Sequence, residues 1–137
     1  MINFDINGIP AILWNSGGDS VIIAAHGSSA DKSADVTRRV AKAAAEFGCD
    51  VLSFDFPGHG ERKNDGVPFD PPHCTADLSA VADVAFSKYG RVGFFGCSIG
   101  AYFGLLSLGD RRLFQCLLLS PVTDMCRALY AICAKNP

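Results

Sequence analysis

One short segment of the sequence has the residue types and spacing of a nucleophilic site, Gly96-Cys97-Ser98-Ile99-Gly100. It follows an apolar run at residues 92–95 and leads directly into another apolar stretch, so the serine lies where a strand turns sharply into a helix. Such a turn raises the hydroxyl to the end of the sheet, and a glycine two residues to either side lets neighbouring backbone pass close by. It also aims the N–H of Ile99 at the place where an attacked carbonyl becomes negatively charged. We therefore predict that Ser98 is a catalytic nucleophile and that Ile99 donates its backbone N–H to an oxyanion hole.

A second candidate segment, His26-Gly27-Ser28-Ser29, follows the apolar run at residues 21–25. At the end of a central strand, His-Gly followed by small residues suits a loop that gives a second backbone N–H to the same oxyanion, and Ser28 is the predicted donor. Taken alone, Gly27 indicates only a tight turn. Opposite the Ser98 turn, the oxyanion interpretation is the stronger, and losing one such donor typically costs about 3–4 kcal/mol of transition-state stabilisation.

The elements that must position these segments are predicted from hydrophobic patterns. Short, nearly continuous apolar runs lie at residues 21–25, 51–54, 92–95 and 116–119, as in strands buried on both faces. Helical patterns separate them, whereas residues 2–15 alternate around Asn7-Gly8, which is typical of an antiparallel hairpin. The predicted fold class is therefore α/β, with a mainly parallel sheet, an N-terminal antiparallel hairpin and three α/β/α layers. Ligands of such sheets bind at the carboxyl ends of the strands.

Four helices are predicted. The first, at residues 36–47, packs through Val36, Val40, Ala44 and Phe47 and ends at a left-handed Gly48. The second, at residues 78–89, has Thr75 as its N-cap and Gly90 as its terminator. The third, at residues 99–108, is apolar nearly all round and is predicted to be central and buried, and the last begins behind Asp124.

Composition excludes several classes of protein. The chain has 137 residues, 49% of them hydrophobic, and a net charge of −2, as expected for a single globular domain over residues 1–137. The small net charge gives no reason to expect a nucleic acid partner. No apolar run reaches the roughly 18 residues that span a bilayer, and the first residues lack the pattern of a secretory leader, so we expect no membrane partner and a cytoplasmic location. Six cysteines without a C-x-x-C pair are then expected to be reduced thiols.

Metal and cofactor sites are not predicted. The candidate ligands His26, His59, His73, Cys74 and Asp55 have spacings that match no metal-binding template. The loop after residues 21–25 lacks the glycines of a dinucleotide-binding motif, and no phosphate-binding P-loop motif occurs.

The segment Asp55-Phe56-Pro57-Gly58-His59-Gly60 after the second buried run adds a resemblance to a known family. With His26-Gly27 before it and the Ser98 motif after it, it resembles the α/β-hydrolase superfamily, in particular small bacterial esterases and peptidase-like serine hydrolases. The resemblance implies an acyl-enzyme on Ser98 formed from a small-molecule ester, thioester or peptide. It further implies oxyanion donors at Ser28 and Ile99, and a Gly58–Gly60 loop that forms a structural shoulder of the site.

The chain departs from this family after Leu119. The family's order is Ser, then Asp or Glu, then His, yet no histidine follows His73 and the chain stops at Pro137. We therefore expect the N-terminal portion of the fold, lacking its last strands, with catalysis impaired. His73 is the candidate substitute base and Asp124 the candidate substitute acid, although Asp124 also suits a helix N-cap. His26 is expected to shape the oxyanion loop, and His59 to be structural.

Two further alternatives stay open at this point. Arg62 and Lys63 either contact an acidic substrate or belong to a solvated loop. The chain as a whole is either a serine hydrolase or a non-catalytic, truncated hydrolase that binds ligands or self-associates, because the strand at residues 117–119 would leave an apolar edge exposed.

Overall fold

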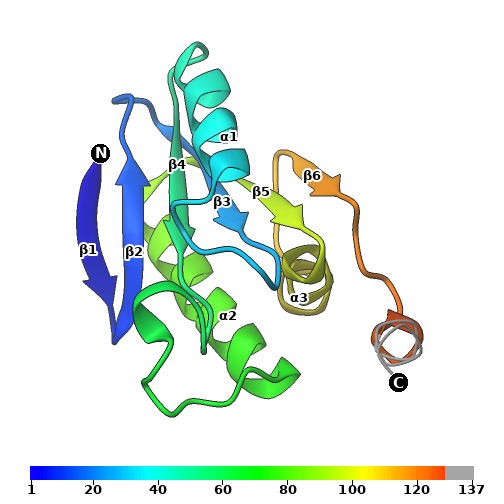
Figure 1. Cartoon of the computed structure of the whole chain (residues 1–137). Coiled ribbons are helices and arrows are strands. Elements are labelled where there is room, and N and C mark those ends of the chain that lie inside the picture. Colours follow the sequence, from blue (N-terminus) through cyan, green and yellow to red (C-terminus); the bar gives the residue numbers. More distant parts are fainter. Residues whose placement is uncertain (129–137) are drawn as a thin grey trace.

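Six strands form one sheet in the order β1-β2-β4-β3-β5-β6 in the computed structural model, which describes residues 1–128. The strands are β1 (Ile2–Ile6), β2 (Ile9–Trp14), β3 (Ser20–Ala25), β4 (Cys49–Phe54), β5 (Arg91–Cys97) and β6 (Cys116–Leu119). Strands β4, β3, β5 and β6 are parallel to one another. At the other edge of the sheet, β2 runs antiparallel to both of its neighbours, β4 and β1 (Figure 1). The predicted fold class is confirmed.

The N-terminal hairpin forms where the Asn7-Gly8 pair predicts it. Both turn residues have positive φ, 53° at Asn7 and 88° at Gly8, and Ile6 pairs with Ile9 across the turn. The N–H of Gly8 donates to Asp5 Oδ1 at 2.6 Å. Because two positive φ angles match the right-handed twist of the strands, the dipeptide is enough to close the hairpin.

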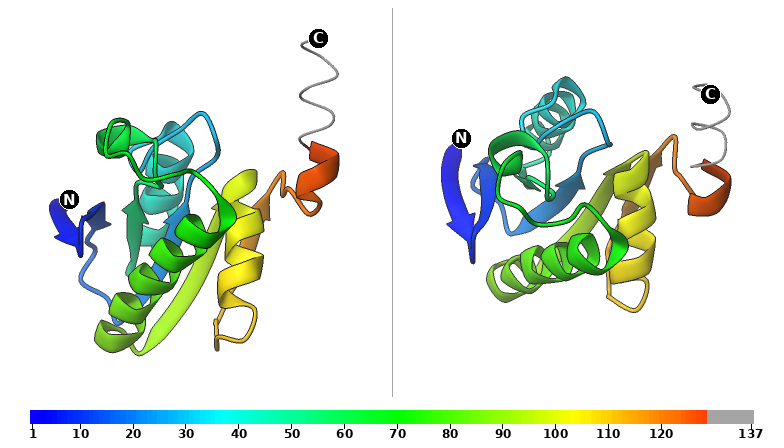
Figure 2. Two further views of the ribbon diagram at one scale, coloured as in Figure 1. Left: turned by 90° about the horizontal axis from the view of Figure 1, so that it is seen from below. Right: turned by 60° about the horizontal axis from the view of Figure 1, so that its bottom comes forward.

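Helices cover both faces of the sheet, as the three-layer prediction requires. Helix α1 (Asp35–Ala45) lies on one face, and α2 (Pro71–Lys88) and α3 (Ile99–Leu108) lie on the other (Figures 1 and 2). Along β3, Val21, Ile23 and Ala25 join the core with α2 and α3, while Ile22 and Ala24 join the core with α1. This alternation puts β3 at the centre of the molecule, with its carboxyl end leading into the His26 loop.

The start of α2 differs from the prediction. The helix begins at Pro71, with Asp70 as the N-cap that accepts a hydrogen bond from the His73 amide at 3.0 Å. Thr75 lies inside the helix, where its hydroxyl donates to the Pro71 carbonyl at 2.7 Å. Proline at the first helical positions lacks only an N–H that would have had no partner, so Asp70-Pro71-Pro72 was the stronger start signal.

Two other predictions about the helices were wrong in part. Phe47 follows the end of α1 and is 86% exposed, so it does not extend that helix's buried face. Gly90, the predicted terminator, follows the C-cap Tyr89 without the positive φ of a helix-ending glycine; its amide donates to Asp19 Oδ1 at 3.2 Å, and a Cβ there would lie 2.5 Å from Asp19 Oδ2. Gly48, by contrast, has the predicted positive φ, 63°.

Helix α3 is buried on one face only. Phe103 and Leu108 pack into the core, but Leu105 and Leu106 are exposed, which corrects the prediction of a helix buried all round. Strand β6 at the sheet edge is likewise exposed along its length, including Leu117, Leu118 and Leu119. An apolar edge at β6 is therefore a feature of the described chain.

Five cysteines lie within residues 1–128, and all are free thiols: Cys49, Cys74, Cys97, Cys116 and Cys126. Burial raises the pKa of Cys74 to about 12, so this thiol is inert at neutral pH. Cys133 lies outside the described residues. In the same part of the chain, none of the helices combines the length and the apolar character that crossing a membrane requires.

Candidate active site

Ser98 occupies a strained turn between β5 and α3. Its backbone angles, φ 52° and ψ −117°, are ones that a residue with a side chain rarely adopts. The turn is held from both sides, because the Ser98 amide donates to the Leu119 carbonyl at 2.9 Å and the Ser98 carbonyl accepts from the Val122 amide at 3.1 Å. Strain of this kind persists only where the surroundings enforce it, which makes Ser98 a candidate functional residue on backbone geometry alone.

The two glycines of the motif let the start of α3 approach the sheet closely. A Cβ on Gly96 would lie 2.6 Å from the Ala101 Cα, and one on Gly100 would lie 2.5 Å from the carbonyl oxygens of both Ala25 and His26. These are impossible contacts for a real side chain. The G-x-S-x-G spacing therefore has the steric origin that its pattern indicates.

The loop after β3 lies directly against Ser98. A Cβ on Gly27 would be 3.4 Å from the Ser98 Cβ, so the predicted donor Ser28 follows a residue in near contact with the serine. The Ile99 amide begins α3 and has no acceptor within the helix. The structure thus brings the Ser98 turn and the Ser28 loop together at the carboxyl ends of β3 and β5. Their roles as nucleophile and oxyanion donors stay predictions.

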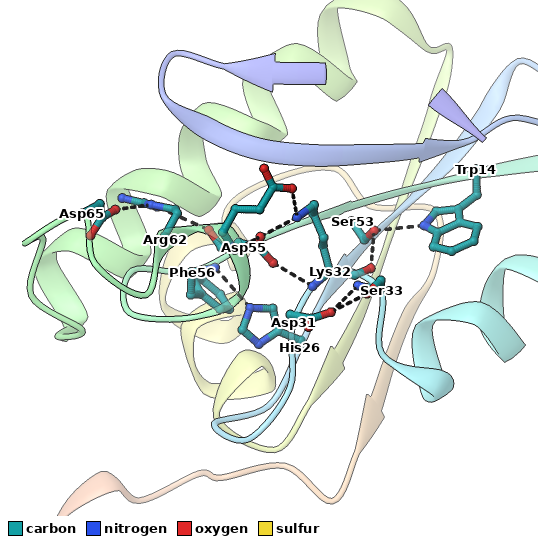
Figure 3. A network of polar contacts seen from close by, with 11 residues as sticks. Trp14, His26, Asp31, Lys32, Ser33, Ser53, Asp55, Phe56, Arg62 and Asp65 are labelled. Carbon is teal, nitrogen blue, oxygen red and sulfur yellow. Dashed lines mark hydrogen bonds and ion pairs between the residues drawn. The ribbon is translucent and has the colours of Figure 1, made fainter. Parts of the chain in front are cut away.

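His26 is buried between the two loops, and both of its ring nitrogens are engaged. Its Nδ1 lies 2.8 Å from the Gly27 carbonyl, and its Nε2 accepts a hydrogen bond from the Phe56 amide at 3.1 Å (Figure 3). Burial, joined by the charge of His59, outweighs the Gly27 hydrogen bond and lowers the pKa of His26 below its usual value. His26 is therefore a neutral structural group that shapes the loop carrying Ser28, and it has no free nitrogen to act as a base.

A buried ion pair also joins the same two loops. The Asp55 carboxylate accepts from the Lys32 ammonium at 2.6 Å and from the Lys32 amide at 2.8 Å, and Lys32 also pairs with Glu61 (Figure 3). Burial alone lowers the pKa of Lys32, but the hydrogen bonds and charges of Asp55 and Glu61 outweigh it and raise the pKa. Sequence reasoning missed Lys32, because nothing local to it indicates that it is buried.

Arg62 forms ion pairs with carboxylates of the protein itself, so it is not free to contact an acidic substrate. Its buried guanidinium pairs with Asp77 on α2 and with Asp65 at 2.6 Å, and it donates to the Asp55 carbonyl at 3.3 Å. Burial alone lowers the pKa of Arg62, but the two carboxylates outweigh this effect and raise it. Arg62 therefore anchors the Gly58–Gly60 loop to α2, while Lys63 next to it is exposed.

His59 also contacts both loops. Its Nδ1 lies 2.8 Å from the Pro57 carbonyl and its Nε2 lies 2.8 Å from the Ser28 carbonyl. The ring thus bridges the loop after β4 to the predicted oxyanion residue, and Ser28 is held from its carbonyl side. This is the structural role expected for His59.

The two substitute residues lie in helix caps. His73 is half exposed in the first turn of α2, with its Nδ1 2.6 Å from Asp70 Oδ1. Asp124 caps a helical turn by accepting from the Arg127 amide at 3.0 Å, and the rest of that predicted helix lies outside the described residues. Within residues 1–128, neither side chain makes a hydrogen bond to Ser98, nor does any cluster of three or more potential metal ligands form.

The sequence matches a known family over most of its length. Residues 22–134 match the model of a family described as "Alpha/beta hydrolase family". No protein of curated function matches the sequence.

Solved structures similar to this chain include several esterases. An esterase of Pyrococcus furiosus superposes with a TM-score of 0.75 at 23% identity, over 99% of this chain and 55% of its own. A cold-adapted esterase from an Arctic intertidal metagenomic library gives 0.67 at 26% identity, over 85% and 58% of the two chains. A Butyrivibrio proteoclasticus protein with ferulic acid bound gives 0.72 at 21% identity, over 88% and 53%. The 137-residue chain thus spans just over half the length of these proteins.

Proposed function

Because the chain belongs to the alpha/beta hydrolase family, we propose that it carries the nucleophile and oxyanion hole of a serine hydrolase acting on carboxylic esters or related acyl compounds. The observation that carries the proposal is the strained backbone turn at Ser98, a residue that has a side chain. Gly27, which belongs to the loop after β3, lies next to this turn. The esterases among the similar structures support the same reaction class.

In the proposed reaction, the Ser98 oxygen attacks the acyl carbon and the carbonyl oxygen becomes negatively charged. The N–H groups of Ser28 and Ile99 donate to that oxygen, at the end of the sheet where both loops meet. A general base takes the serine proton and returns it to the departing alcohol, which leaves an acyl group on Ser98. Water then attacks this ester and releases the acid.

The base and its carboxylate partner are not supplied by the described residues. His26 and His59 are held by backbone groups and His73 by Asp70, so none of them is placed to take the Ser98 proton. Loss of the base from a triad costs on the order of a million-fold in turnover, about 8 kcal/mol. We therefore expect little esterase activity from the 137-residue chain alone.

The test is covalent labelling of the 137-residue chain with a fluorophosphonate, located by peptide mass spectrometry. We expect slow labelling confined to Ser98, accelerated by imidazole in the buffer because imidazole replaces the base. Ser98→Ala should abolish the labelling, and Ser107→Ala on α3 should leave it unchanged. Labelling that persists in Ser98→Ala would overturn the nucleophile assignment, and labelling as fast as in a complete hydrolase would overturn the expected impairment.

A second candidate role is self-association through β6. Its outer edge has no partner strand within residues 1–128, and Leu117, Leu118 and Leu119 are exposed. Strand β6, Cys116–Leu119, carries no charged side chain of the kind that keeps edge strands apart. Antiparallel pairing of β6 with β6 of a second copy would join the two sheets into one continuous sheet about a two-fold axis.

A further inference from the structure

A polar hollow of about 300 Å³ lies between the loop after β3 and the loop after β4, lined by residues 28–31, 58–60 and Lys63. It begins at Ser28, the predicted oxyanion donor, which follows the glycine packed against Ser98. Ser98 and Ile99 do not line the hollow, so Ser28 is the residue that joins it to the proposed oxyanion hole. We propose that the hollow binds a carboxylate carried by a short acyl substrate, with Lys63 as the cation that pairs with it. This inference rests on the proposed function and specifies its substrate class.

The charges of the two loops single out Lys63. Lys32 is paired with two carboxylates, Asp55 and Glu61, and Arg62 is paired with two others, Asp65 and Asp77, so the charge of each of these cations is more than compensated. Lys63 forms no ion pair within residues 1–128. It is an exposed residue that lines the hollow. An ammonium next to a concave site with its charge uncompensated attracts an anion more strongly than one already paired.

The remaining groups of the hollow suit a polar ligand. The exposed Ser28 and Ser29 offer hydroxyl groups that can donate to a carboxylate, and Gly58 and Gly60 add no side chain that would fill the space. The ring of His59 lies between the Pro57 and Ser28 carbonyls, 2.8 Å from each, and its N–H donates to one of them, which orients the ring in the wall of the hollow. A site with rigid walls loses less conformational entropy when a ligand binds.

Asp31 is the one anion that lines the hollow, and it is engaged elsewhere. Its Oδ1 accepts from both the amide and the hydroxyl of Ser33, each at 2.7 Å, toward the start of α1 (Figure 3). These two hydrogen bonds stabilise the ionised carboxylate, and with them the pKa of Asp31 is lowered, so Asp31 stays negatively charged beside the hollow. The competing ligand class is therefore a cation bound by Asp31, and the experiment must separate the two.

The size of the hollow limits the ligand. Ligand pockets in proteins range from about 300 to 1,000 Å³, so this one is at the small end. It accommodates a short group such as the far carboxylate of a dicarboxylic half-ester rather than a long acyl chain.

Binding rather than turnover tests the proposal, so it does not depend on an active serine. The isotope-labelled 137-residue chain is titrated with monomethyl glutarate, neutral dimethyl glutarate and cationic glycine ethyl ester, and amide shifts are followed by NMR. We expect saturable shifts at Ser28, Ser29 and His59 with monomethyl glutarate only, weakening as salt is raised. Lys63→Met should weaken this binding at least tenfold, and Lys63→Arg should retain it.

Two control variants sharpen the result. Lys88→Met removes an exposed lysine at the end of α2 and should leave the affinity unchanged. Ser98→Ala should also bind monomethyl glutarate normally, because the hollow does not include Ser98. If the parent chain binds monomethyl glutarate but is not labelled by the fluorophosphonate, the proposed reaction is wrong and the proposed binding site stands. Equal binding of the neutral diester, no effect of Lys63→Met, or preferential binding of glycine ethyl ester would each overturn the proposal.

Discussion

The Nε2 atom of His26 accepts a hydrogen bond from the Phe56 amide at 3.1 Å, which joins the loop after β3 to the loop after β4. An acceptor nitrogen carries no hydrogen, so the ring hydrogen is on Nδ1, where it can donate to the Gly27 carbonyl at 2.8 Å. Protonation of Nε2 would turn an acceptor into a donor that faces another donor. The loop that carries Ser28 therefore depends on a neutral His26.

The first prediction concerns the pH dependence of stability. Because burial and the charge of His59 lower the pKa of His26 in the folded chain, the unfolded chain binds more protons once the pH falls below about 6.5, the usual value. The free energy of unfolding should thus be fully retained above that pH and fall below it, by up to about 1.4 kcal/mol per pH unit. Denaturant unfolding between pH 5 and 8 measures this fall.

His26→Gln is the matched variant for that measurement, since glutamine does not titrate. It should be less stable than the parent at pH 8 and should lack the His26 share of the acid decline. His59 and His73 are common to both proteins, so the difference between the two curves isolates His26. Parallel curves would show that His26 does not titrate with unfolding.

The second prediction concerns the buried pair of Lys32 and Asp55. Lys32→Met leaves a fully buried carboxylate without its cation, which should cost about 3 kcal/mol of unfolding free energy, at the low end for broken buried pairs because two amides still donate to Asp55. Lys88→Met at the surface should change stability by less than about 0.5 kcal/mol.

A double variant tests the cause of that loss. Asp55→Asn removes the charge but keeps an acceptor oxygen, so combining it with Lys32→Met should cost less than the sum of the two single changes. Denaturation midpoints of the four proteins give the coupling. Strict additivity would mean that the two side chains do not interact.

The third prediction separates steric overlap from backbone strain. Gly100→Ala would place a Cβ 2.5 Å from two backbone oxygens, so it should destabilise the chain by more than about 3 kcal/mol. Gly8→Ala has open space around it and suffers only from its positive φ, which costs about 1–2 kcal/mol. Thermal or denaturant unfolding compares the two, and a smaller loss for Gly100→Ala would contradict the close approach of α3 to the sheet.

The fourth prediction concerns the edge at β6. If β6 pairs with itself, sedimentation velocity of the parent should show a dimer whose fraction rises with concentration, and Leu118→Lys should shift it to monomer because a lysine on an edge strand opposes pairing. Phe47→Lys changes another exposed apolar residue, just after the end of α1, and should have no effect. A parent that stays monomeric at high concentration would exclude this role.

Local patterns were sufficient to predict the hairpin, the four parallel strands and the Ser98 turn. Each depends on residues a few positions apart: the positive φ of Asn7-Gly8, the apolar run of a buried strand, and the glycines that flank the serine. The same local reasoning misplaced the start of α2 at Thr75, because it undervalued proline at the first helical turn. It also overestimated the burial of α3, because an apolar helix does not specify what covers its outer face.

The sequence by itself thus determined the turn at Ser98 and the strand end that leads to Ser28, since turns and strand ends are set by neighbours along the chain. Only the tertiary structure decided what supports them and which charges remain free. The pairings of His26 with Phe56 and of Lys32 with Asp55 join residues 30 and 23 positions apart. Contacts of that range exist only after the strands are ordered side by side, and that ordering is what engages Arg62 and leaves Lys63 exposed.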